Sequence, residues 1–286
     1  MNKADWTSIA LAAVGLAAAA PAARACPGVG VVVRIVGRPQ DVIIQRAGSP
    51  VARPRVLEVL CQADAIHVEN GARVTLSLDG AGPVTVQGAQ TYLVGARRGA
   101  ASLSGNAYRN VSDHLLPDMK RQPWDVRLRG PGAELGFAIT SLSSGRQTLT
   151  AGSRDLLVRL DGGVGAYKVQ IANASGAVLA HASGSSINLM LPGLDLTPGA
   201  YVIKATDSSG AAVEGRITVV AGAAPVSDDF AGMDDHEVQA AAQAADLARQ
   251  HGDTWSLEAE QILNRTPAGG LDRESVFELI ESYGPA

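Results

Sequence analysis

The stretch ADAIHVENGARVTLSLDG, residues 63–80, decides how the first part of the chain folds. Apolar and polar residues alternate on both sides of its Asn70-Gly71 pair. Alternation with a period of two is typical of a half-buried β-strand, and an Asn-Gly pair between two such runs indicates a tight turn. The stretch therefore predicts a β-hairpin.

The register of this hairpin follows from the requirement that one face be wholly apolar. A two-residue loop would place Val68 opposite Arg73 and leave apolar residues on both faces. A three-residue loop instead places Val68 opposite Ala72, with Gly71 in the left-handed conformation that glycine adopts easily. We predict the second register, which points His67 outward and opposite Arg73.

The same window is rich in residue types that also build metal and catalytic sites. They are Asp64, His67, Glu69, Arg73 and Asp79. A metal site needs a neutral imidazole and several convergent ligands, and an outward histidine facing an arginine is a poor start for one. We interpret the set as a solvated strand face, with a metal or catalytic cluster as the alternative.

The first 25 residues have the pattern of a cleaved secretory signal peptide. Lys3 precedes an apolar run at residues 9–20, and Ala-Arg-Ala at residues 23–25 fits the small-x-small rule for signal peptidase. The run is too short to span a bilayer, and no later stretch approaches the ~20 apolar residues that a spanning helix needs. We expect a periplasmic or secreted chain without a transmembrane helix.

Cys26 directly follows the predicted cleavage site, and Cys61 is the other of the two cysteines. An even pair in an oxidising compartment indicates a disulfide, here between the first strand and the strand before the hairpin. The alternative is a lipidated Cys26. However, Ala23 and Arg24 stand where a lipoprotein signal has a bulky aliphatic and a small residue. The alternatives exclude each other, because a lipidated cysteine cannot form the disulfide.

The composition favours a mostly β protein of two small domains. The chain has 286 residues, 32 of them glycine, and only 4% are aromatic. Its net charge of −4 is unevenly spread, since the part after residue 223 is strongly acidic and the part before it is mildly basic. Scattered arginines without accompanying aromatics argue against nucleic-acid binding.

The segments GVGVVVRIVG, DVIIQR, RVLEVL, PVTVQG and TYLVG join the hairpin in a first β domain, residues 26–111. Residues 30–95 resemble a FecR-type domain, whose bacterial signature has a Gly-Asp pair before an isoleucine, a small-residue turn and an alternating strand ending in Asp-Gly. The matching residues are Ile66, Asn70, Gly71, Ala72, Leu76, Leu78, Asp79 and Gly80. The chain departs from the signature at Ala63-Asp64, where the family has Gly-Asp. It also lacks the anti-sigma helix bundle and membrane helix of the regulators that name the family. The resemblance implies an extracytoplasmic β domain without catalytic residues, and it does not extend to control of a sigma factor.

Residues 112–133 hold three prolines and mixed charge, so residues 112–122 are predicted to be a linker, with the next strand expected at WDVRLRG, residues 124–130. Further short strands separated by turn residues over 123–221 favour an immunoglobulin-like β-sandwich. The piece LTPGAYVIKATDSSG resembles the late strands of an immunoglobulin-like or fibronectin-like domain, where Tyr201 would be a corner tyrosine. A resemblance to a fold type identifies no ligand.

Residues 222–233 predict an acidic linker, and residues 234–286 predict three short helices. The first is DDHEVQAAAQAADLARQHG, ending at Gly252, and the second is DTWSLEAEQILNR. The third is capped by Asp272, with Leu271 and Val276 as a hydrophobic staple. The helices could pack on each other, on the sandwich or on a partner, and we favour packing within the chain.

The sequence contains no phosphate-binding loop, no His-Glu-x-x-His, no paired Cys-x-x-Cys and no Gly-x-Ser-x-Gly. The run DDHE at residues 234–237 is interpreted as helix-start electrostatics instead of a cation site. We therefore assign no catalytic, cofactor-binding or metal-binding residues and expect no enzyme activity and no cofactor. The leading hypothesis is a non-catalytic secreted envelope protein that binds or scaffolds a protein or wall polymer through its β domains. The alternative is a periplasmic sensory component that relays a signal to a membrane partner through its acidic C-terminal helices.

Overall fold

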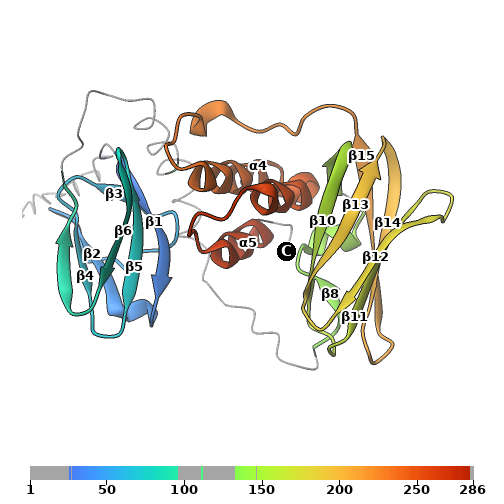
Figure 1. The fold of residues 1–286 in the computed structure, drawn as a ribbon, viewed down its shortest axis with the longest axis horizontal. Coiled ribbons are helices and arrows are strands. Elements are labelled where there is room, and N and C mark those ends of the chain that lie inside the picture. Colours follow the sequence, from blue (N-terminus) through green and yellow to red (C-terminus); the bar gives the residue numbers. More distant parts are fainter. Residues whose placement is uncertain (1–25, 27, 96–110, 112–132, 146, 284–286) are drawn as a thin grey trace, which may run out of the picture.

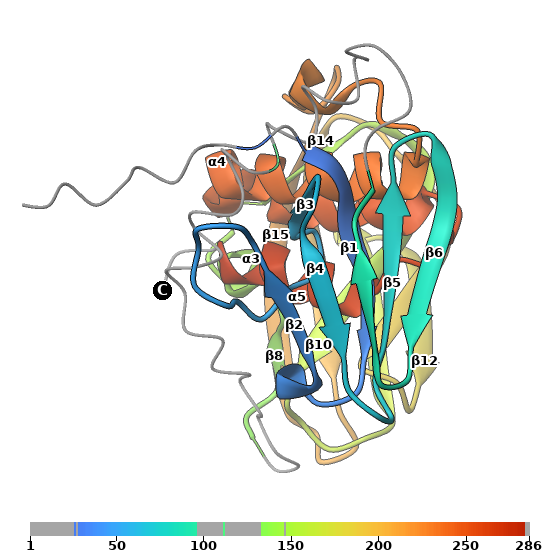
Figure 2. The same cartoon turned by 90° about the vertical axis from the view of Figure 1, so that its left-hand side faces the viewer.

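The computed structural model describes residues 26, 28–95, 111, 133–145 and 147–283. The predicted signal peptide, the linker at 112–122 and the strand at 124–130 lie outside the described residues. The fold is mainly β, as predicted, with two β domains and a C-terminal helical segment. The two long helices lie between the β domains (Figure 1). In Figure 2, turned by 90°, the first domain stands in front of them. No helix in the described part of the chain is long and apolar enough to cross a membrane.

The first β domain consists of two sheets that enclose a common apolar core. One sheet has the strand order β3-β1-β5-β6 and the other has the order β2-β4-β7. The strands are β1 (Gly28–Val36), β2 (Val42–Gln45), β3 (Val59–Cys61), β4 (Ala65–Val68), β5 (Arg73–Leu78), β6 (Ala81–Gln87) and β7 (Gln90–Leu93), with a short 3₁₀ helix η1 (Pro39–Asp41) before β2.

The strands on either side of Asn70-Gly71 do not form the predicted hairpin. The turn itself is present, because the Ala72 amide donates to the Glu69 carbonyl at 3.1 Å and Gly71 has a φ of +85°. However, β4 pairs with β2 and β7, whereas β5 pairs with β1 and β6. The chain therefore crosses from one sheet to the other at this turn.

The predicted register is consequently wrong. Val68 lies opposite Val42 and Gln90 instead of Ala72, and His67 is not opposite Arg73. Alternation specifies which side chains face the core, and strands in two facing sheets satisfy it as well as two neighbours in one sheet. The apolar residues of both strands are indeed buried in the common core.

Strand β1 is covered on both faces. Val32 lies in the core of the first domain, whereas Val31 and Val33 belong to a separate core formed with the helices. A strand buried on both sides has a continuous apolar sequence, which explains the run GVGVVV at residues 28–33.

The second β domain is a β-sandwich of the immunoglobulin type, as predicted. Its sheets have the orders β13-β10-β8 and β12-β11-β14-β15-β9, where β9 runs parallel to β15. The elements are β8 (Gly136–Phe137), a short helix α3 (Thr140–Ser143), β9 (Gln147–Thr150), β10 (Gly152–Asp161), β11 (Tyr167–Asn173), β12 (Val178–Gly184), β13 (Asn188–Leu196), β14 (Gly199–Thr206) and β15 (Ala212–Val220).

The C-terminal segment begins with a 3₁₀ turn η3 (Asp228–Phe230) and continues as α4 (His236–Arg265) and α5 (Arg273–Ser282). The two helices predicted over residues 234–265 form α4 and meet at a kink, where His251 has the non-helical φ and ψ of −140° and 30°. The break lies one residue before Gly252, where the sequence predicted it. A Cβ built at Gly252 would lie 2.6 Å from the Tyr283 carbonyl oxygen, so glycine is required for the close approach of the end of α5.

The helices pack within the chain and share one apolar core with both β domains. Side chains from β1, β3 and β10 meet side chains from η3, α4 and α5 in this core. Many of the helical positions are alanines, whose small side chains let α4 approach the strands closely. We call this region the wedge core; among its members are Val31, Val33, Val59, Leu157, Phe230, Ala241, Ala245, Leu263, Phe277 and Ile280.

Replacing Leu263 by alanine tests the wedge core. Leu263 is fully buried there, so Leu263→Ala should lower the free energy of unfolding by about 2–5 kcal/mol, as large-to-small core substitutions do. Urea unfolding followed by circular dichroism measures the loss. Asp253→Ala, an exposed position on the same helix, serves as the control and should change stability by less than about 0.5 kcal/mol. Equal stability of the two variants would contradict the packing described.

Candidate functional site

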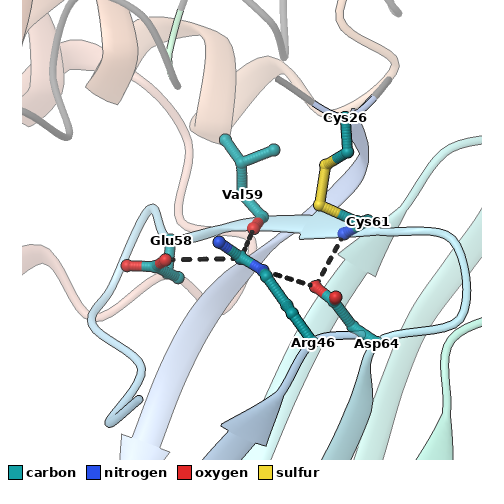
Figure 3. The surroundings of a disulfide bond; sticks show 6 residues. All are labelled: Cys26, Arg46, Glu58, Val59, Cys61 and Asp64. Carbon is teal, nitrogen blue, oxygen red and sulfur yellow. Dashed lines mark hydrogen bonds and ion pairs between the residues drawn. A yellow bond between two sulfur atoms is a disulfide. The ribbon is translucent and has the colours of Figure 1, made fainter. Parts of the chain in front are cut away.

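Cys26 and Cys61 form a disulfide, with a Cα–Cα distance of 5.8 Å (Figure 3). The bond joins Cys26, two residues before β1, to the last residue of β3. It fits an oxidising, non-cytoplasmic location, because disulfides persist only where thiols are not kept reduced. A lipidated Cys26 could not form this bond.

A buried ion-pair network lies directly beside the disulfide (Figure 3). The Asp64 carboxylate accepts hydrogen bonds from the Cys61 amide at 2.8 Å and from Arg46 Nε at 3.1 Å. Arg46 also donates to the Glu58 carboxylate at 3.3 Å and to the Val59 carbonyl. Both bonds to Asp64 reach the same carboxylate oxygen, and together they fix the turn after β3.

The position before Asp64 has an unusual backbone conformation. Ala63 has a φ of +68°, in the left-handed region that favours glycine. This is the position where the FecR-type signature has glycine and this chain has alanine. The departure noted in the sequence therefore lies at a point where the backbone would itself favour the glycine of the signature.

The polar residues of the opening stretch are not brought together. His67 is half-buried on the β2-β4-β7 sheet, where its Nδ1 lies 2.7 Å from Thr91 Oγ1 and its Nε2 lies 3.3 Å from Gln45 Oε1. Arg73 belongs to the other sheet. Over the described ranges, no three His, Cys, Asp or Glu side chains are grouped so that they could hold a metal ion.

The predicted turn at Asp79-Gly80 contacts the start of α4. Gly80 has a φ of +68°, and its amide donates to the Asp234 carboxylate at 3.2 Å. Ser77 donates to the carboxylate of Asp235, which also accepts from the first amides of the helix and so caps it. The acidic run at residues 234–237 therefore both caps α4 and attaches it to the first domain.

Tyr201 lies near the start of β14 with its ring buried in the core of the sandwich. Its hydroxyl donates to the Thr197 carbonyl at 2.8 Å and accepts from the Thr197 amide at 3.1 Å. These are the bonds of a tyrosine corner, which fixes the turn into the strand.

The interface between α4 and the second domain is polar and tightly bonded. The side-chain amide of Gln261 accepts from the Leu157 amide at 2.8 Å and donates to the Leu157 carbonyl at 3.0 Å. Gln147 in β9 accepts from the Leu257 amide of α4 at 2.8 Å. Both glutamines are fully buried, so these bonds satisfy backbone groups that water cannot reach.

Two buried arginines of β10 form ion pairs with acidic side chains of the helices. Arg154 donates to Glu258 at 2.7 Å, and that carboxylate also accepts from Thr150 and from Arg265 at 3.0 Å. Glu258 is 1% exposed and both of its oxygens are bonded. The carboxylate of this buried pair is therefore fully bonded, as a buried charge requires, whereas Arg154 Nε has no hydrogen-bond partner among the described residues.

Arg159 is the centre of a second cluster, which we call the Arg159 cluster. It donates to Glu274 at 2.7 and 3.0 Å and to Glu281 at 2.6 Å, and it lies 4.6 Å from the centre of the Phe277 ring. A third carboxylate, Glu260, is 3.8 Å from Arg159 Nε. Burial raises the pKa of Glu260 well above its usual value, and the neighbouring Glu281 carboxylate raises it further.

Sequence reasoning did not find this interface, although two signals indicated it. An acidic C-terminal part follows a basic body, and the acids of α4 and α5 do pair with Arg154 and Arg159. In addition, residues 156–160, LLVRL, are all buried, whereas a strand with one face in water would alternate.

The outer surface of the five-stranded sheet carries a hollow of about 370 Å³. We call this surface the outer sheet face. By register, Lys168 lies opposite Ser183 and Thr206 on the neighbouring strands. Gln170 lies in the same way between His181 and Lys204. The hollow is lined by Lys168, Val169, Gln170, His181, Ala182, Ser183, Lys204 and Thr206.

No family model matches the chain, and no curated protein matches it. Three solved structures share parts of the fold at low scores. CopC from Methylosinus trichosporium OB3b is 24% identical over 28% of this chain and 87% of its own, with a TM-score of 0.23. The fibronectin(III)-like modules of Clostridium thermocellum CbhA are 10% identical, covering 68% of this chain and 80% of theirs (TM-score 0.21). Bacteroides ovatus SGBP-B, solved with a mixed-linkage heptasaccharide, is 15% identical over 69% of this chain and 44% of its own (TM-score 0.22). Scores at this level carry no functional inference.

The strained backbone at Ala63 gives a testable prediction. Ala63 is exposed, so Ala63→Gly loses no packing and removes the steric cost of a left-handed alanine, about 1–2 kcal/mol. Part of this gain is offset by the greater chain entropy of glycine in the unfolded state. The net effect should be a gain of about 0.5–1 kcal/mol in the free energy of unfolding, measured by urea titration. Ala65→Gly, in the extended backbone of β4, should instead lower stability. A loss of stability in both variants would contradict the left-handed conformation of residue 63.

Proposed function

We propose that the protein is a non-catalytic, secreted protein of the bacterial envelope that binds or scaffolds a protein or wall polymer through its β domains. In this proposal a signal peptide is removed ahead of Cys26, and the first domain is FecR-like. The observation that carries the proposal is the position of α4 and α5, whose apolar sides are buried against both β domains. A helix pair used in this way joins two β domains and leaves their outer surfaces for partners.

The outer sheet face is the part of the second domain best suited to a partner. Lys168 and His181 are exposed there and make no hydrogen bond or ion pair with the described residues. Lys204 is paired with Glu214 at 3.5 Å, but both are solvent-exposed, so this ion pair contributes little stability and is easily exchanged. The lysines therefore favour a partner with negative charge, whether an acidic protein surface or an anionic wall polymer.

The neighbouring edge of the sheet adds apolar surface. β12 is the edge strand of the five-stranded sheet, and Val178 and Leu179 at its start are 53% and 43% exposed. An exposed edge strand can pair with an extended segment of a partner, and adjacent apolar side chains would strengthen that contact. The hollow and this edge lie on the paired strands β11, β12 and β14.

The relay hypothesis has less support. A relay through the C-terminal helices would need α4 or α5 to present an apolar side to a membrane partner. Those sides are occupied in the wedge core, so the helices would first have to leave both β domains.

Capture of partners from bacterial envelope extract tests the proposal. The full chain is immobilised, and bound proteins and polymers are identified by mass spectrometry and carbohydrate analysis. Because charge complementarity carries the contact, Lys168→Glu/Lys204→Glu should reduce capture at least tenfold, and raising the salt concentration should weaken capture by the unmodified chain.

The matched control is Arg53→Glu/Arg73→Glu, which makes the same change of charge at two exposed positions of the first domain. It should capture the same partners as the unmodified chain. If both double variants lose capture equally, the outer sheet face is not the contact surface. If turnover of a captured molecule is detected, the protein is an enzyme and the proposal fails.

A further inference from the structure

We propose that Glu260 and Glu281 share a proton beside Arg159, and that this shared proton makes the docking of the helices on the second β domain tighter in acid than in alkali. The Arg159 cluster would then be a proton-dependent clamp between α4, α5 and β10. This inference goes beyond the proposed binding function and does not depend on it.

The hydrogen bonds around Arg159 leave one carboxylate without a donor. All three nitrogens of Arg159 already donate to Glu274 or Glu281. Glu260 is 1% exposed, and neither of its oxygens accepts a hydrogen bond from the described residues. An ionised carboxylate without donors in such a site is very costly, whereas a protonated one can donate to a neighbouring carboxylate.

The charges in the Arg159 cluster also indicate that one of its carboxyl groups is protonated. Arg159 faces Glu260 from β10, while Glu281 and Glu274 face it from α5. If all three glutamates were ionised, one positive charge would stand against three negative ones in a largely buried site. A single proton shared between two adjacent carboxyl groups relieves this repulsion, as it does in other buried carboxylate pairs.

The three glutamates have different exposure, which identifies the pair that holds the proton. Glu274 is 54% exposed and bonded twice to Arg159, and this bonding lowers its pKa. Glu281 is 18% exposed, and burial raises its pKa, as it does for Glu260. Glu278, also on α5, has a pKa raised by partial burial and by Glu274, but it lies on the exposed side of the helix. The proton therefore belongs to the Glu260–Glu281 pair.

The sign of the pH effect follows from this assignment. An unfolded glutamate releases its proton near pH 4.3, whereas the folded pair retains one at higher pH. The folded state therefore binds one proton more than the unfolded state between about pH 4.3 and the raised pKa of the pair. The stabilisation is fully present below this window and is lost as the pH rises through the folded pKa. The unfolding constant should rise by up to tenfold per pH unit across the window.

The substitution Glu260→Gln isolates the effect. Glutamine keeps the size of the side chain and can donate to Glu281 at every pH, so the variant should lose the pH dependence that the pair supplies. The ratio of the unfolding constants of the unmodified chain and the variant should therefore rise by up to tenfold per pH unit between about pH 4.3 and the raised pKa of the pair, and level off above it. Urea unfolding of the full chain gives this ratio. Amide hydrogen exchange over α5 gives the same ratio locally.

The control is Glu258→Gln, two residues earlier on the same helix and equally buried. Its carboxylate is fully bonded to cationic and neutral donors, so the substitution should weaken the fold at every pH and leave the pH dependence unchanged. Infrared spectroscopy supplies an independent readout. Above the pH at which unfolded glutamates ionise, the unmodified chain should still show a protonated carboxyl band that Glu260→Gln lacks.

The proposal is overturned if Glu260→Gln and the unmodified chain have the same pH dependence of unfolding. Absence of any protonated carboxyl band above the pH at which unfolded glutamates ionise would overturn it as well. Should Glu260→Gln fail to fold, Glu281→Gln removes the other member of the pair and should abolish the same pH dependence; retention of the dependence in that variant would refute the clamp.

Discussion

The structure depends on burial of the helices α4 and α5 between the two β domains. Neither domain presents a fully polar surface on this side, since β1 contributes Val31 and Val33 and β10 contributes Leu157 to the wedge core. The backbone of β10 is satisfied there by Gln261, and its two arginines are neutralised by acids of the helices. Hydrophobic burial and specific polar bonding thus act at the same interface, and the polar bonds determine which helix surface faces which strand.

Local alternation predicted the strands and their buried faces, but it did not predict their partners. The apolar residues around Asn70-Gly71 are buried as expected, yet the two strands lie in different sheets. The physical reason is that a turn and an alternating pattern determine the direction of side chains and not the neighbour across the backbone. The disulfide was predictable, because only two cysteines are present and both follow the predicted cleavage site.

The candidate site was the part least accessible to sequence reasoning. The arginines of β10, Arg154 and Arg159, lie about a hundred positions before their partners Glu258 and Glu260 in α4. Arginine and glutamate are most often exposed, so no local pattern marks these residues as buried. The opposite charges of the two regions and the unbroken apolar run around Arg159 were the signals that they would meet. By contrast, Tyr201 was identified from a short local motif, because its hydrogen bonds reach only to Thr197.

The double coverage of β1 has a consequence for the order of assembly. Its inner face can be enclosed as soon as the first 95 residues have emerged, but its outer face meets α4 and α5 only after residues 236–283 have been delivered. During synthesis, an apolar strip of the first domain therefore stays uncovered until nearly the whole chain has been made. Completion of the fold is postponed until the C-terminal helices have been synthesised, and the uncovered strip is open to non-native contacts in the interval.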